Sequence, residues 1–153
     1  MLKDTILENN IRKEVVDNPY MKMLDMEFLE IGKGYAKGRI KLQPKHLNPY
    51  GSVHGGCLYS LADSVSGTAA STYGSPVSTI TGTMNFIRPA MHTKYITCTA
   101  TEVRQGKSVS VYNIEIVNDE GVLLENGTFT FYMLSGKPEI KDPFNSQAEE
   151  KLS

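Results

Sequence analysis

The feature that most restricts the fold of this chain is a run of long strand-like segments that follows one apolar helix. Four segments have the composition and alternation of strands, namely residues 77–88, 94–104, 107–118 and 121–133. The connections between them are residues 88–90, 104–106 and 118–121. The last connection reads Asn-Asp-Glu-Gly, which is typical of a hairpin turn. We therefore expect a meander of antiparallel strands over the second half of the chain.

The helix before these strands carries one apolar stripe. Its apolar side chains at helical spacing are Leu58, Leu61, Ala62, Val65 and Ala69. Residues 67–72 are all small, so the helix should pack very closely against its neighbours. Upstream, residues 34–42 alternate between apolar and charged or bulky positions, as a half-exposed strand does. Together these patterns predict an α+β domain in which an antiparallel sheet curls around a central helix.

The two ends of the chain are expected to flank a single domain, because 153 residues give room for one sizeable core. Residues 2–16 favour a short amphipathic helix that Asn18 and Pro19 should end, with a short helix or turn over 20–24. The tail after Leu134 is charged and is expected to be loose or a short helix. The expected boundaries are an N-terminal helical extension at 1–18, one domain at 19–134 and a tail at 135–153.

Composition excludes several classes of partner. Sixteen basic and seventeen acidic residues leave a formal charge of −1, which provides no electrostatic footprint for nucleic acid or an anionic membrane. No apolar run approaches the roughly 18 residues of a membrane-spanning helix, and the N-terminus lacks a secretory hydrophobic segment. Cys57 and Cys98 are far apart in the sequence and are expected to be reduced, buried thiols. These features predict a cytoplasmic protein.

The loop that enters the central helix contains the first candidate site. His54, Gly55 and Gly56 stand where unpaired backbone N–H groups and a partial positive charge are expected. Because Gly55 has no side chain, a ligand oxygen can come close to its N–H and be stabilised as negative charge builds on it. The alternative is that the two glycines simply let the loop and the helix pack closely.

Asp63 is the second candidate, because a carboxylate is unusual in the second or third turn of a helix that is otherwise apolar. Partial desolvation would raise its pKa towards a value that suits a general base. The alternative is a structural carboxylate that bonds to a nearby hydroxyl. The hydroxyls in reach along the helix belong to Ser60, Ser66 and Thr68.

Other site types fit the sequence poorly. The residues that might form a metal set are His46, His54, Asp63 and His92, and their spacing matches no compact ligand motif. No Gly-x-Ser-x-Gly segment is present for a serine hydrolase, and residues 32–34 precede a strand rather than joining a strand to a helix. Cys57 follows its possible partner His54 by three residues within a turn, so a core cysteine is favoured over a nucleophile. We expect no metal and no cofactor.

Four segments in this order resemble one enzyme family. Residues 48–56 read NPYGSVHGG, residues 61–63 read LAD, residues 85–90 read NFIRPA and residues 105–108 read QGKS. This set resembles the signature of PaaI-like hotdog thioesterases, the phenylacetate-degradation type within the 4-hydroxybenzoyl-CoA thioesterase superfamily. The resemblance runs from about Pro19 to Met133. It implies the hotdog fold, in which an antiparallel sheet wraps around a long central helix.

The resemblance also implies roles for particular residues. Asp63 matches the catalytic carboxylate, acting as general base or nucleophile, and Gly55 matches the glycine whose N–H polarises the thioester carbonyl. Asn48 and His54 support the loop, and Thr79 helps to orient water, with Thr81, on the same strand face, as the alternative. The residues implied in binding substrate or coenzyme A are Gly56, Thr81, Arg88, Gly106, Lys107 and Ser108.

The expected function is therefore hydrolysis of an acyl-CoA thioester, with the acyl group left open. Two alternatives remain, a non-catalytic hotdog protein that senses acyl-CoA and a dehydratase or hydratase that acts on acyl thioesters. Gly55 and Asp63 are eight residues apart, which is about 12 Å along a helix. Because that distance is too long for one substrate, we expect active sites that are shared between two chains. The resemblance implies that the assembly is a homodimer or a homotetramer.

Overall fold

A computed structural model describes residues 5–136, and residues 1–4 and 137–153 lie outside the described part. The sheet has six antiparallel strands in the order β1-β2-β4-β5-β6-β3. Its strands are β1 Met26–Gly32, β2 Tyr35–Lys41, β3 Val77–Phe86, β4 Tyr95–Gln105, β5 Val109–Val117 and β6 Leu123–Met133. The helices are α1 Thr5–Asp17, α2 Pro19–Met23, the 3-10 turn η1 Pro44–His46 and α3 Gly55–Ser71. The predicted α+β class is confirmed.

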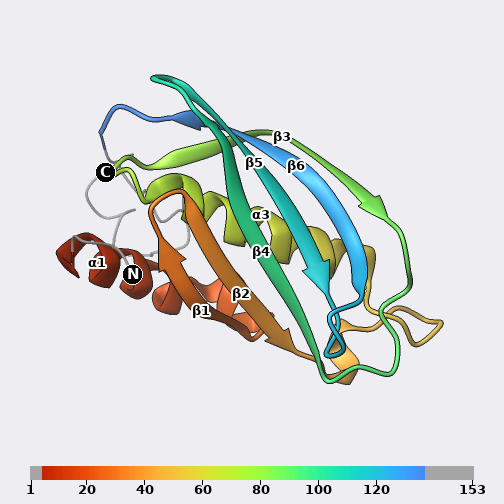
Figure 1. Cartoon of the computed structure of the whole chain (residues 1–153). Helices are drawn as coiled ribbons and strands as arrows, with labels where there is room; N and C mark the ends of the chain where they lie inside the picture. The colour runs from red at the N-terminus through yellow and green to blue at the C-terminus, as the bar shows by residue number, and fades with distance from the viewer. Residues whose placement is uncertain (1–4, 137–153) are drawn as a thin grey trace, which may run out of the picture.

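Helix α3 lies in the hollow of the curved sheet, which bends over it in Figure 1. The predicted stripe is buried, since Leu61, Ala62, Val65 and Ala69 have no exposed surface. A Cβ added at Gly38 of β2 would stand 2.8 Å from a methyl carbon of Val65. The absence of a side chain at Gly38 therefore lets β2 approach Val65 closely, and Ala69 and Ala70 in the segment of small residues are fully buried.

The strand order corrects the predicted meander. β3 lies at the far edge of the sheet and pairs with β6, while β4 lies between β2 and β5. The connection between β3 and β4 therefore runs over residues 87–94 and crosses the end of the sheet. The turn between β4 and β5 is residues 106–108 rather than 104–106. Gly121, with φ +75°, closes the predicted turn after Asn118, whose side chain accepts from the backbone of Glu120 and Val122.

β1 is a strand that the sequence pattern did not predict. It contains a bulge between Phe28 and Glu30, because Phe28 lies opposite Gly38 while Glu30 lies opposite Lys37. The bulge moves the next core-facing apolar residue to Ile31, so the apolar side chains do not keep a spacing of two. Ile31 packs with Ile11 of α1 in a small second cluster.

The two N-terminal helices lie close to the ranges 2–16 and 20–24 that the periodicity predicted, where they are described. α1 ends at Asp17, and the side chain of Asn18 accepts a hydrogen bond from the Met21 N–H at 3.0 Å as the cap of α2. Pro19 occupies the first turn of α2. The predicted start of the first helix at residues 2–4 lies outside the described residues.

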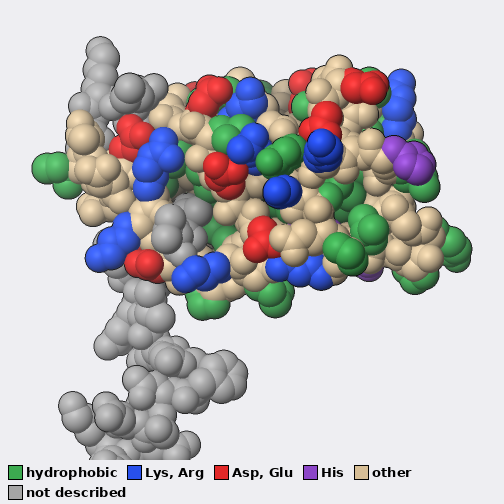
Figure 2. Space-filling view, turned by 90° about the horizontal axis from the view of Figure 1, so that it is seen from below, with side chains coloured by type: hydrophobic (Ala, Val, Ile, Leu, Met, Phe, Trp, Pro, Cys, Tyr) green, Lys and Arg blue, Asp and Glu red, His purple; other side chains and the backbone are tan. Residues whose placement is uncertain are grey.

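The face seen in Figure 2 carries basic and acidic side chains interspersed rather than gathered by sign. In the described part of the chain, no helix is both long enough and apolar enough to cross a membrane.

Candidate active site

The start of α3 offers one open backbone donor. His54 is the N-cap, and its Nδ1 accepts a hydrogen bond from the Gly56 N–H at 2.8 Å. The N–H groups of Cys57 and Leu58 donate to the His54 carbonyl. Within residues 5–136, no hydrogen bond uses the Gly55 N–H. At the positive end of the helix, this group is free to meet a ligand oxygen, while Gly56 is held by the cap.

Asn48 organises the loop that leads to this helix start. Its Oδ1 accepts from the Tyr50 N–H at 2.9 Å and from the Ser52 N–H at 3.2 Å, and its Nδ2 donates to the Ser52 hydroxyl. The loop then joins the fold through Val53, whose N–H donates to the Ala90 carbonyl at 3.1 Å. One amide side chain thus fixes the loop that precedes Gly55.

Asp63 accepts a hydrogen bond from a strand rather than from its own helix. The Thr79 hydroxyl on β3 donates to Asp63 Oδ1 at 2.7 Å. The hydroxyls of Ser60, Ser66 and Thr68 donate to backbone carbonyls of α3, so none of these three is the partner of the Asp63 carboxylate. Asp63 is half-buried, which leaves its carboxylate open to a ligand.

Thr81 does not join this pair, and the expected shared strand face is wrong. β3 has a bulge between Thr79 and Thr81, so that Thr79 lies opposite Phe131 and Thr81 lies opposite Thr130. Neighbouring residues on β6 point to opposite faces of the sheet, and Phe131 is the buried one. The extra residue therefore turns the Thr81 side chain away from Asp63.

A cavity of about 290 Å³ opens beside Gly55. It lies between the loop after Asn48, the first turn of α3, and residues 86–90, which are the last residue of β3 and the segment that follows it. Asp63 does not line this cavity, because it stands eight residues further along α3, about 12 Å along the axis. Within one chain, the open N–H and the carboxylate thus belong to two separate places.

Glu125 on β6 lines the same cavity, and sequence reasoning missed it. Its side chain is 1% exposed, and no hydrogen bond reaches its Oε2 from the described residues. Burial raises the pKa of this carboxyl to about 7. A signal was present, because Glu125 keeps the same two-residue phase as Phe129 and Phe131, which face the core.

Cys57 behaves as the predicted core thiol. It is buried, and its pKa is raised to about 11, first by burial and then by the nearby Glu125 carboxylate. Burial, again with a contribution from Glu125, also raises the pKa of Cys98. Both thiols are therefore poor nucleophiles near neutral pH.

The residues implied in coenzyme A binding lie at two ends of β3. Arg88 follows β3 beside the Gly55 cavity, and its guanidinium donates to the Leu123 carbonyl at 2.7 Å. The turn 106–108 lies next to the start of β3, since Ser108 accepts from the Met133 N–H and Met133 lies opposite Val77. β3 has ten residues, so these two places are roughly 30 Å apart in one chain.

The imidazole ring of His46 is held by two hydrogen bonds to the backbone. Its Nδ1 accepts from the Gln43 N–H at 2.9 Å, and its Nε2 donates to the Leu24 carbonyl at 3.0 Å. Both ring nitrogens are therefore engaged. Across residues 5–136, no three His, Cys, Asp or Glu side chains gather in a way that would hold a metal ion.

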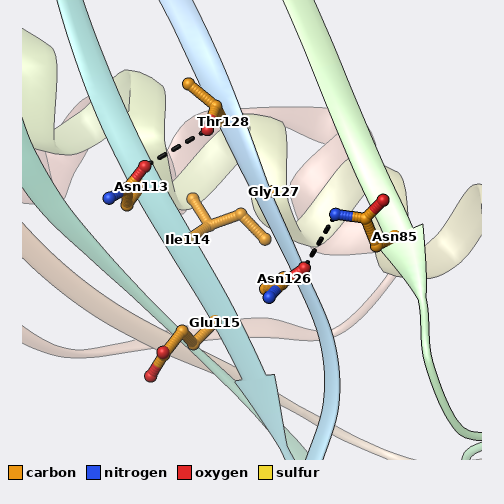
Figure 3. Close-up of a pocket in the computed structure, with 7 residues that line it drawn as sticks. All are labelled: Asn85, Asn113, Ile114, Glu115, Asn126, Gly127 and Thr128. Atoms are coloured by element: carbon orange, nitrogen blue, oxygen red, sulfur yellow. Dashed lines mark hydrogen bonds between the residues drawn. The ribbon is translucent and has the colours of Figure 1, made fainter.

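A second hollow lies on the outer face of the sheet and contains none of the predicted site residues. Figure 3 shows two side-chain hydrogen bonds across its strands, Asn85 to Asn126 at 2.9 Å and Thr128 to Asn113 at 3.2 Å. Apart from these amide and hydroxyl groups the described lining includes one carboxylate, that of Glu115, as a candidate base or nucleophile. We therefore take the inner cavity as the candidate site.

Comparisons with known proteins point to one family. The family model described as the thioesterase superfamily matches residues 50–125. Acyl-coenzyme A thioesterase PaaI of Escherichia coli is 34% identical over 99 residues, covering 65% of this chain and 71% of that protein. Acyl-coenzyme A thioesterase 13 of Mus musculus is 28% identical over 97 residues, covering 61% and 69% respectively. The solved structure of the Escherichia coli PaaI protein has a TM-score of 0.81 at 27% identity, covering 86% of this chain and 95% of that one.

Proposed function

This chain belongs to the thioesterase superfamily and has its hotdog fold, and we propose that it hydrolyses acyl-coenzyme A thioesters to a free acid and coenzyme A. Support comes from the bacterial and mouse relatives, both of which are named as acyl-coenzyme A thioesterases. In this proposal Asp63 is the catalytic carboxylate and the Gly55 N–H is the donor to the thioester oxygen.

The observation that carries the proposal is the setting of the Asp63 carboxylate. Oδ1 accepts from Thr79, and within the described residues Oδ2 makes no hydrogen bond. That oxygen can take a proton from water as the water attacks the thioester carbon. Alternatively it can attack the carbon itself, and water then hydrolyses the resulting anhydride to the free acid and restores the Asp63 carboxylate. In either route the C–S bond breaks, and the thiolate leaves readily because thiols ionise near about pH 8.5.

The site is complete only when two chains meet. The Gly55 N–H and Asp63 are about 12 Å apart along α3, and both must reach one carbonyl group within about 3–3.5 Å. β3 is an edge strand that pairs with β6 alone, and it exposes Ile80 and Phe86 by 51% and 56%. A second β3 running antiparallel would cover this edge and bring Gly55 of one chain towards Asp63 of its partner.

The same pairing explains the separated coenzyme A residues. Arg88 stands at the end of β3 and Lys107 stands near its start, roughly 30 Å away in one chain. An antiparallel partner strand places the end of one β3 beside the start of the other. Arg88 and the partner's turn 106–108 can then meet the phosphates of one coenzyme A molecule.

The direct test is release of free thiol from several acyl-CoAs, followed with a thiol reagent. Asp63→Asn keeps the size of the side chain and removes the base, so turnover should fall about 10²–10⁴-fold while acyl-CoA still binds. Glu115→Gln, the same change on the outer face of the sheet, is the control and should retain turnover. Binding without turnover by the unmodified protein would indicate a sensor, and a changed double bond would indicate a hydratase.

The shared site is tested with two inactive variants, Asp63→Asn and Gly55→Pro. Refolding them together gives mixed dimers with one intact site and one doubly damaged site. With random pairing about half the dimers are mixed, so roughly a quarter of the original activity should return. A mixture that stays inactive, although each variant is folded and dimeric, would reject the shared site.

A further inference from the structure

The cavity beside Gly55 contains one carboxyl group that the proposed hydrolysis does not use. Glu125 is 1% exposed, and its Oε2 atom has no hydrogen-bond partner in the described structure. It stands on the inner face of β6, opposite Phe86 of β3 and Ile116 of β5. A buried carboxyl without a partner is costly, so a group that fills the cavity is its natural partner.

The surroundings of Glu125 offer few groups that could offset the cost of burying its carboxyl. The walls of the cavity include the buried apolar residues Val53, Leu58 and Ala90. Among the described residues, Arg88 is the one cationic side chain that lines the cavity, and it donates to the Leu123 carbonyl. Cys57 of α3 and Cys98 of β4 face the carboxyl as neutral thiols, because burial raises the pKa of both.

The occupant of this cavity follows from the proposed function, on which this inference rests. Gly55 lines the cavity, and in the proposed function its N–H holds the thioester oxygen, so the acyl group attached to that carbonyl enters beside it. A volume of about 290 Å³ is enough for a short chain or a substituted ring, since a cavity of about 150 Å³ holds benzene. The acyl group therefore lies within the walls that include Glu125.

We propose that Glu125 is a specificity-determining residue that selects acyl groups carrying a hydrogen-bond donor, such as a hydroxyl, over plain hydrocarbon chains. A hydroxyl both donates and accepts, so it satisfies the carboxyl in either protonation state. A hydrocarbon leaves Oε2 unpaired, and an acyl group with its own carboxylate adds a like charge beside it. Both of these groups are disfavoured by the same side chain.

The pKa of Glu125, raised by burial to about 7, gives the selection a pH dependence. Below that pH the carboxyl is neutral, and a plain chain meets a neutral group. Above it the carboxyl is ionised, and a plain chain then covers an unpaired charge, which costs more. The preference for a hydroxylated acyl group should therefore increase as the pH rises through about 7.

The experiment compares butyryl-CoA with 2-, 3- and 4-hydroxybutyryl-CoA for the unmodified protein, Glu125→Leu and Glu125→Gln. The unmodified protein should prefer one hydroxylated isomer by about 10–100-fold in kcat/KM. Glu125→Leu should lose this preference and keep butyryl-CoA hydrolysis. Glu125→Gln should keep part of the preference but lose its rise with pH, and Glu115→Gln should match the unmodified protein.

The pH readout separates a role in specificity from a structural one. Histidines titrate in the same range, so only the part of the pH change that Glu125→Gln removes is assigned to Glu125. The inference would be overturned, and the proposed function left standing, if the ratio of kcat/KM for hydroxylated over plain substrate were the same in the unmodified protein and in Glu125→Leu. An unchanged pH profile of that ratio in Glu125→Gln would overturn it as well. Release of no thiol from these or other acyl-CoAs would overturn the proposed function itself.

Discussion

The two ends of α3 are built in opposite ways. At its N-terminal end the Gly55 N–H has no partner in the described structure, and Glu125 stands beside it with an unpaired oxygen. At its C-terminal end, Thr72 donates to the Ala69 carbonyl at 2.7 Å and accepts from the buried Gly34 N–H at 2.9 Å. The N-terminal end of α3, called the open end below, has polar groups without a hydrogen-bond partner in the described structure. The C-terminal end around Thr72, called the closed end, has its polar groups paired.

Beyond Thr72 the closed end continues into a side-chain network. The Tyr73 hydroxyl donates to Glu102 of β4, a bond that raises the tyrosine pKa to about 12. The ammonium of Lys33 lies 5.2 Å from the centre of the Tyr73 ring. These contacts tie the turn between β1 and β2 to the helix end. The comparison teaches that polar groups without a hydrogen-bond partner indicate where a ligand is expected. Polar groups that are paired within the chain indicate where hydrogen bonds stabilise the fold.

The largest expected effect is at the open end, in Gly55→Pro. Proline removes the N–H at a position where a helix tolerates it, and His54 before it has φ −60° and ψ 132°, which suit a following proline. Loss of the donor should lower kcat about 10²–10³-fold in a thiol-release assay.

Gly55→Ala is the matched control, because it keeps the N–H. Its Cβ, like that of proline, would lie 3.3 Å from the exposed Phe86 ring. It should retain activity within about tenfold of the unmodified protein. An equal loss in both variants would assign the effect to Phe86 rather than to the open donor.

The second-largest expected effect is a pH dependence of the unfolding free energy that arises from Glu125 at the open end. The folded pKa of Glu125 is about 7, above its ordinary 4.5, so between these values the folded state binds more protons than the unfolded state. The unfolding free energy should therefore fall by about 3 kcal/mol as the pH rises from about 4.5 to 7, and then level off. Urea unfolding at several pH values should show this fall, and Glu125→Gln should remove it.

Glu115→Gln on the exposed face should leave that slope in place, because water solvates its carboxylate in both states. A slope that survives in Glu125→Gln would mean that the Glu125 carboxyl is not the titrating group.

A smaller effect is expected at the closed end, in Thr72→Val. Valine keeps the shape but removes the acceptor for the buried Gly34 N–H, so the unfolding free energy should fall by about 1–3 kcal/mol. Turnover per folded molecule should stay unchanged, since Thr72 lies far along α3 from Gly55. Thr72→Ser keeps the hydroxyl and should lose less stability. A tenfold loss of kcat in folded Thr72→Val would erase the distinction between the two ends.

The smallest expected effect is that of a chelator. Because neither end of α3 carries a metal set among the described residues, exhaustive EDTA treatment should leave thiol release unchanged. Activity that disappears with EDTA and returns with zinc would contradict the assignment of Asp63 and Gly55.

Several features followed from the sequence alone because they depend on local periodicity. The stripe of α3 and the alternation of β2 were predicted and are buried as expected. The motif around residues 48–63 indicated the family, and the comparisons confirm it. The same motif pointed to Thr79, whose hydroxyl lies 2.7 Å from the Asp63 carboxylate, although its catalytic role remains a proposal.

Other features depended on the tertiary structure because they arise between segments that are distant in the sequence. A bulge in β1 hid that strand, and a bulge in β3 turned Thr81 away from Asp63, since one extra residue reverses every later side chain. The place of β3 beside β6 depends on which strand edge remains free after β2 pairs with β4. Glu125 shows the same limit most clearly. Its spacing placed it on the core face, but its unpaired oxygen and its cavity exist only because α3, β3 and β6 come together around it.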